Sequence, residues 1–155
     1  FKKDTLPEGW RMSDEGVLTH TKGGGDIVTD KQYQDFILEL DWKISEGGNS
    51  GIFFHVSEDH DYVWLGGPEM QVLDNIAHQD AMKPETSAGA NYALHAPCKD
   101  VTNPVGEWNH VKLVVDGPTL NIGSMARNFL NTNFGLTTGK HEWYRASSKT
   151  CQIMA

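Results

Sequence analysis

The residues best suited to acid–base chemistry lie in one short segment that holds two carboxylates, an amide and an imidazole. Glu69, Gln71 and Asp74 come first, and His78 follows them. On a strand, Glu69 and Gln71 point to the same face because successive side chains alternate. A bulge after Leu73 would bring Asp74 onto that face as well. Such a row pairs a group that takes a proton with one that donates it, and histidine titrates nearest to neutral pH.

The same pattern also has an ordinary structural explanation. The water-facing side of an antiparallel strand alternates polar and apolar residues, so Glu69 and Gln71 could simply be solvated. His78 would then be a loop histidine. Trp64 and Tyr92 are candidates for stacking on the face of a sugar ring, with packing at the rim of the site as the alternative.

The elements that must position these residues are short β-strands. The segment 36–44 alternates apolar and polar residues along most of its length, which predicts an antiparallel strand half exposed to water. Further strands are expected at 52–56, 70–73 and 108–115, with shorter candidates at 16–21 and 26–29. No segment before residue 121 has a convincing helical period, so the sequence predicts an all-β sandwich. The long polar stretch 76–104 is interpreted as a binding loop, or as an error of assignment.

Composition restricts the classes of partner. The chain has 155 residues, which suits one domain, and its formal net charge is −8. Without a run of Lys or Arg, nucleic acid and anionic membranes are poor partners. No apolar run approaches the roughly 20 residues of a membrane span. The chain starts with Phe1 rather than Met, so we expect its true N-terminus to be missing.

Five runs of residues resemble the 3-keto-disaccharide hydrolase family, and they occur in the family's order. They are GGGDIVT (23–29), LDWKIS (40–45), GNSGIF (48–53), GPEMQVLDN (67–75) and PVGEWN (104–109). The resemblance extends from about Gly9 to Leu120. It implies a concanavalin- or laminarinase-like β-jelly-roll sandwich that acts on glycosides oxidised to a ketone at sugar carbon 3. It also implies a bacterial enzyme exported to the periplasm or beyond, in some cases as a lipoprotein.

The motif positions of the family carry over as Asn49, Glu69, Gln71, Asp74, His78 and Tyr92. From the residue types we expect catalytic roles for Glu69, Asp74 and His78, and substrate-binding roles for Asn49, His55, Trp64, Gln71 and Tyr92. At position 55 the family would have Arg or another polar residue.

A ketone at carbon 3 acidifies the proton on carbon 2, so a base can remove it while the group on carbon 1 leaves; water then adds back. We expect His78 or Glu69 as the base and Asp74 or Glu69 as the acid. Gln71 and Asn49 are expected to orient the sugar by hydrogen bonds. A divalent metal held by Glu69 and His78 is a further option, although no ligand spacing supports it.

Residues after Leu120 depart from the family. The resemblance implies that a strand beginning Glu-His-Trp-Leu-Asn-Gly should follow, whereas this chain continues as NIGSMA. Suitable synonymous codons, read one base out of frame, encode His-Trp-Leu-Asn-Gly, and that frame stays open to residue 155. We therefore expect residues 1–120 to be an incomplete sandwich domain and 121–155 to be an irregular, frameshifted, non-native tail. This would leave the fragment itself inactive. A genuinely divergent tail is the alternative.

Two other functions fit the same residues. A laminarinase-like retaining glycosidase would use a row of carboxylates, and Glu69-x-Gln71-x-x-Asp74 resembles that row in spacing. The Gln in the middle and the shorter Asp at the end argue against it. A non-catalytic carbohydrate-binding module would use Trp64, Tyr92 and Asn49 and would need neither acid nor base.

Overall fold

The computed structural model describes residues 6–117, 119–125 and 130–134. The chain divides into two compact units, Phe1–Gln32 and Tyr33–Ala155. The first unit contains the antiparallel pair β1 (Trp10–Met12) and β2 (Leu18–His20). In this unit the indole N–H of Trp10 donates to the carbonyl oxygen of Gly25 at 2.9 Å, which closes the loop after β2.

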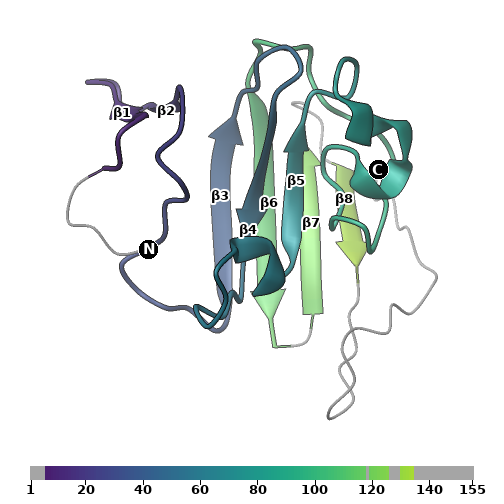
Figure 1. The fold of residues 1–155 in the computed structure, drawn as a ribbon. Helices are drawn as coiled ribbons and strands as arrows, with labels where there is room; N and C mark the ends of the chain where they lie inside the picture. Colours follow the sequence, from purple (N-terminus) through teal and green to yellow (C-terminus); the bar gives the residue numbers. More distant parts are fainter. Residues whose placement is uncertain (1–5, 118, 126–129, 135–155) are drawn as a thin grey trace. The chain divides into compact units, whose positions relative to one another are not determined.

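The second unit contains two antiparallel sheets (Figure 1). One has the order β3 (Phe36–Trp42), β6 (Asn109–Asp116), β7 (Thr119–Met125) and β8 (Leu130–Phe134). The other pairs β4 (Asn49–Phe53) with β5 (Glu69–Leu73). The strands expected at 36–44, 70–73 and 108–115 are thus confirmed within a few residues. The strand expected at 52–56 instead begins at Asn49, because pairing with β5 runs back to Leu73.

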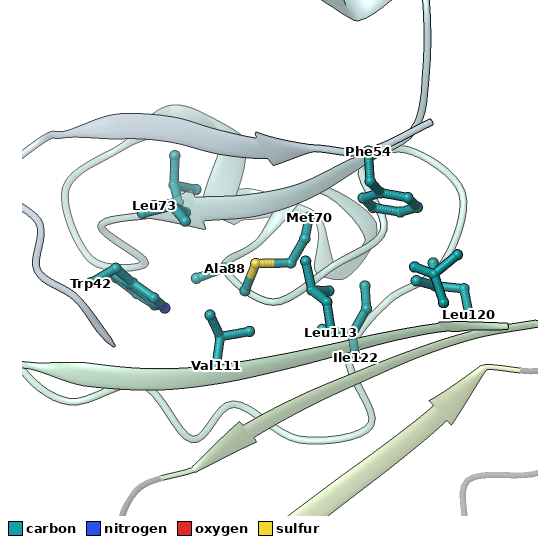
Figure 2. Close-up of a cluster of buried hydrophobic side chains, with 11 residues drawn as sticks. Trp42, Phe54, Met70, Leu73, Ala88, Val111, Leu113, Leu120 and Ile122 are labelled. Carbon is teal, nitrogen blue, oxygen red and sulfur yellow. The ribbon is translucent and has the colours of Figure 1, made fainter. Parts of the chain in front are cut away.

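The hydrophobic core lies between these two sheets (Figure 2). Val111, Leu113 and Val115 alternate along β6 and face inward, and Met70 and Val72 of β5 meet them. Burying each such side chain contributes about 1.5–3 kcal/mol. The expected all-β sandwich is therefore confirmed. Within the described part of the chain, no helix has the length and apolarity needed to cross a bilayer.

The expectation of an irregular chain from residue 121 onward is wrong for two segments. Strand β7 runs through 121–125, and 130–134 form β8. Ile122 follows Leu120 by two residues, so the apolar period of β7 continues, and Ile122 is 1% exposed. Backbone pairing does not depend on side-chain identity, which lets the strand extend. The rest of the proposed tail, 126–129 and 135–155, lies outside the described residues.

The long segment after β5 packs along the edge of β5 opposite β4. It contains two short 3₁₀ helices, η2 (Gln79–Met82) and η3 (Pro84–Thr86); a third, η1 (Val63–Leu65), precedes β5. Gln71 N–H donates to Ala90 O at 3.0 Å, and Tyr92 N–H donates to Glu69 O at 2.8 Å. Residues 89–92 thus act as a third strand beside β5, and Tyr92 falls on the same face as Glu69.

Candidate functional site

Glu69 begins β5 and lies over a glycine of β4. A Cβ atom built on Gly51 would sit 1.9 Å from Oε1 of Glu69, so the carboxyl group occupies the space that any larger residue would fill. Burial, and then the nearby Asp80 carboxylate, raise the pKa of Glu69 from 4.5 to about 7. Glu69 can therefore take or give a proton near neutral pH.

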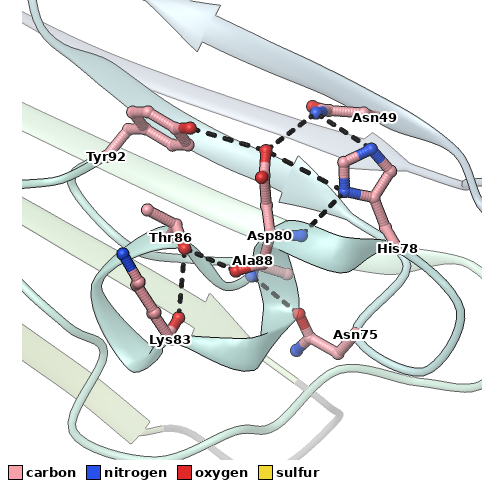
Figure 3. A network of polar contacts seen from close by, with 8 residues as sticks. All are labelled: Asn49, Asn75, His78, Asp80, Lys83, Thr86, Ala88 and Tyr92. Atoms are coloured by element: carbon pink, nitrogen blue, oxygen red, sulfur yellow. Dashed lines mark hydrogen bonds and ion pairs between the residues drawn. The ribbon is translucent and has the colours of Figure 1, made fainter.

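A polar network surrounds Asp80 (Figure 3). Its Oδ2 accepts hydrogen bonds from Asn49 Nδ2 and from the Tyr92 hydroxyl, each at 3.4 Å. His78 Nδ1 lies 3.9 Å from the same oxygen. Burial raises the pKa of Tyr92, and the negative charge of Asp80 adds to that shift, so the phenol stays protonated and donates. The network joins four segments of the chain: β4, the turn before η2, η2 itself and residues 89–92, which follow η3.

The hydrogen bonds of His78 indicate where its proton lies. The backbone N–H of Asp80 donates to Nδ1 at 3.2 Å. A neutral imidazole accepts at one nitrogen and carries its hydrogen on the other, so this geometry assigns the hydrogen to Nε2. Nε2 also lies 3.5 Å from Asn49 Nδ2, a longer contact. His78 thus presents an N–H donor beside Asn49.

Two of the residues expected in the row are almost completely buried. Asp74 is 2% exposed, and its two oxygens accept the backbone N–H groups of Gly47 at 2.8 Å and Ile76 at 2.9 Å. These bonds lower its pKa, so Asp74 holds the turn as a carboxylate, and its expected role as the acid stays a prediction. Gln71 is 1% exposed, and its Oε1 has no hydrogen-bond partner among the described residues.

Two further candidates have other surroundings. His55 has a positive φ of 50°, and its Nε2 lies 2.6 Å from the carbonyl oxygen of Gln34. Trp64, in η1, stacks on Tyr62 with ring centroids 4.5 Å apart and is 61% exposed. The structure brings Asn49, Tyr92 and His78 together, but it does not bring His55 or Trp64 into that network.

The side chains around Glu69 and His78 show whether a metal ion could be held there. Within the part of the chain that the structure describes, no three His, Cys, Asp or Glu side chains are arranged to hold a metal ion. The atoms of His78 and Asp80 that could bind a metal instead contact each other and Asn49. The residues present do not fit a metal centre, and no chemical step is assigned to one.

Asp80 is the site residue to which sequence reasoning gave no role. It lies in an irregular segment where neither strand nor helix periodicity indicates a direction. The spacing His78-x-Asp80 was the one available signal. Only the packing of η2 beside β5 brings Asp80 near Glu69.

Comparison with known proteins identifies the family of this chain. The family described as 3-keto-alpha-glucoside-1,2-lyase-like domains matches residues 2–133. A protein of Bacteroides thetaiotaomicron (strain ATCC 29148) named 3-keto-disaccharide hydrolase is 32% identical over 151 residues, covering 84% of this chain and 52% of that protein. The chain thus spans about half the length of this relative.

Solved structures are also similar to this chain. Two of them are crystal structures of candidate glycosyl hydrolases from Parabacteroides distasonis ATCC 8503. The first, at 1.70 Å resolution, has a TM-score of 0.71 and 28% identity, covering 81% of this chain and 62% of its own. The second, at 2.00 Å, has a TM-score of 0.69 and 26% identity, covering 83% and 64%. With the family match over most of its length, the chain belongs to the 3-keto-alpha-glucoside-1,2-lyase-like domain family.

Proposed function

We propose that this chain contributes the site of a carbohydrate hydrolase that cleaves glycosides carrying a ketone at sugar carbon 3. The observation that supports this most is Glu69, whose pKa is raised to about 7 by burial and by Asp80. A carboxylate with this pKa is a stronger base than an ordinary glutamate and is about half ionised at neutral pH. The family match and the curated relative support the same class of substrate.

In the proposed mechanism Glu69 removes the proton from carbon 2. The C–H electron pair moves into a double bond between carbons 2 and 3, and the ketone oxygen takes the negative charge of the resulting enolate, to which His78 Nε2–H and Asn49 donate. When the ketone re-forms, that pair shifts to make the double bond between carbons 1 and 2, and the bond from carbon 1 to the leaving oxygen breaks. The proton held by Glu69 then passes to the leaving oxygen, and addition of water across the double bond completes the hydrolysis.

The alternative of a laminarinase-like retaining glycosidase has less support. It needs a second carboxyl group about 5–5.5 Å from the first, free to act as nucleophile. Asp74, its candidate, is committed to two backbone N–H groups. Turnover of an unoxidised β-glucan would favour that alternative all the same.

The test is turnover of a 3-keto-glucoside by the protein with its reading frame restored near codon 121, with and without chelator. Glu69→Gln should lower turnover by roughly 10²–10⁴-fold, the range typical of a lost general base. Glu39→Gln, on the outer face of the other sheet, is the matched control and should keep full activity. A Glu69→Gln variant as active as wild type would remove Glu69 from the mechanism.

We also propose that residues 121–155 result from a single-base deletion near codon 121 and that the fragment itself is inactive. The out-of-frame reading that restores the family's His-Trp-Leu-Asn-Gly supports this. Resequencing the locus tests the origin, and an intact frame that still encodes this tail would refute it. Assaying the 155-residue chain beside the frame-restored product tests the activity, and equal turnover by both would refute the second claim.

A further inference from the structure

Asp80 is the residue on which the polar side chains of the site converge. Its Oδ2 lies 3.4 Å from Asn49 Nδ2, 3.4 Å from the Tyr92 hydroxyl and 3.9 Å from His78 Nδ1. These three groups come from β4, from the run after η3 and from the turn before η2 (Figure 3). The carboxylate accepts from Asn49 and Tyr92, and the backbone N–H of the same residue donates to His78 Nδ1, so one residue holds groups from separate parts of the chain.

The backbone of Asp80 is itself fixed. Its carbonyl oxygen accepts from the Thr86 hydroxyl and, at 3.4 Å, from the Lys83 N–H. Its N–H donates to His78 Nδ1 at 3.2 Å. The η2–η3 segment therefore holds the residue, while its side chain stays 30% exposed and reachable from solvent. A residue that is fixed by its backbone, and whose carboxylate points to other polar side chains, is suited to organise a site.

We propose that Asp80 is the positioning residue of this site: its carboxylate oxygen fixes Asn49 and Tyr92 around Glu69, and its backbone N–H fixes His78. The same carboxylate carries the charge that acts on Glu69. This inference rests on the proposed function, in which Glu69 is the base. The titration that tests the role of Asp80 needs no substrate, so this inference and the proposed function can fail separately.

The side chains that face Glu69 come from β4, from the η2 segment and from residues 89–92. The outward positions of β4 present Asn49, Gly51 and Phe53, none of which is ionisable. From η2 comes Asp80, and from the run after η3 comes Tyr92, whose pKa is raised and which stays neutral. His78, from the turn before η2, contacts Asp80. Asp80 is thus the anionic neighbour that acts on Glu69, in addition to burial, which is the larger cause.

The experiment is a carboxyl ¹³C NMR titration of Glu69 in the 155-residue chain. In wild type the Glu69 midpoint should lie near 7. Asp80→Asn keeps an oxygen that can accept from Asn49 and Tyr92 but removes the charge. The Glu69 midpoint should then fall, yet stay above 4.5 because burial remains. Asp41→Asn, on the outer face of the other sheet, is the control and should leave it unchanged.

A folded Asp80→Asn chain with an unchanged Glu69 midpoint would overturn the proposal. If Asp80→Asn does not fold, Asp80→Ser decides, because it also removes the charge and leaves a smaller polar side chain. The Glu69 midpoint should again fall below its wild-type value, and an unchanged midpoint would overturn the proposal. In an active, frame-restored protein, the rise of kcat with pH should move to lower pH in Asp80→Asn, as for a weaker base. A structural role alone would not move it.

Discussion

Two glutamates on outward-facing strand positions have opposite electrostatic surroundings. Glu39 of β3 faces Lys112 of β6, with 2.5 Å between Oε1 and Nζ, and this hydrogen-bonded ion pair lowers the pKa of Glu39. Glu69 of β5 has the Asp80 carboxylate and partial burial instead, and its pKa is raised to about 7. Both are glutamates on antiparallel strands with an alternating pattern. The strand position therefore does not decide their chemistry; the segments packed around each residue do.

The neighbouring pair on the first sheet makes the same point. Asp41 and His110 face each other across β3 and β6, with 2.8 Å between Oδ1 and Nδ1. Exposed cross-strand pairs of this kind contribute little to stability because water screens them. On β5, the packed run 89–92 and helix η2 limit that screening around Glu69. The substitutions below test this difference, from the largest expected effect to the smallest.

Gly51→Ala should have the largest effect on activity among substitutions that leave Glu69 itself in place. The new Cβ would meet Oε1 of Glu69, which must move, while Gly51 has no positive φ that would strain alanine. In the frame-restored protein proposed above, a displacement of this size is expected to lower kcat by roughly 10²-fold. Ser50→Ala, at the next residue of β4, is the control and should keep wild-type kcat. A fully active, well-folded Gly51→Ala enzyme would contradict the placement of Glu69.

Asp74→Ala should be the most damaging to stability. It removes both acceptors from the N–H groups of Gly47 and Ile76, and Gly47 lies in the turn with a positive φ of 63°. We expect the melting temperature at pH 7 to fall by several degrees. The pKa of Asp74 is lowered by these bonds, so its stabilisation is present above the ordinary value of 3.8 and is lost as pH falls below it. Melting curves that show the same Asp74→Ala loss at pH 2.5 as at pH 7 would contradict this role.

Glu69→Gln should raise stability at alkaline pH. Because the folded-state pKa of Glu69 is raised, ionisation opposes folding, and the cost grows as pH rises from 4.5 to about 7. Gln cannot ionise, so the free energy of unfolding at pH 8 should increase by about 1–2 kcal/mol after discounting for partial exposure. At pH 4 the two proteins should be equally stable. Urea denaturation at both pH values checks this, and a Glu69→Gln chain less stable at pH 8 would contradict it.

Lys112→Met should have the smallest effect. It removes the partner of Glu39, but both side chains are well exposed, so the melting temperature should change by no more than about 2 °C. The pKa of Glu39 should return toward its ordinary value, which a carboxyl titration would record. A large loss of stability would contradict the view that water screens the Glu39 pair on β3 more than it screens the surroundings of Glu69 on β5.

Part of the fold and the site could be read from the chain itself. Alternation along 36–44 predicted β3, because a strand buried on one face requires that period. The spacing of Glu69 and Gln71 correctly placed both side chains on one face of β5. The same pattern could not show that Gln71 is sealed from solvent, because that depends on residues 89–92 packing beside the strand. The bulge expected to bring Asp74 into the row is replaced by a turn that uses Asp74 for its own N–H groups.

The sequence by itself determined β3, β5 and β6, the sandwich and the family, because these depend on local alternation and on ordered motifs. Only the tertiary structure decided which polar groups meet. Asp80 lies in a segment without periodicity, and Asn49 lies far from it along the chain, yet the packing of η2 beside β5 brings both into one network. Proton affinity depends on burial and on nearby charge, and neither is a property of a residue's position in the chain.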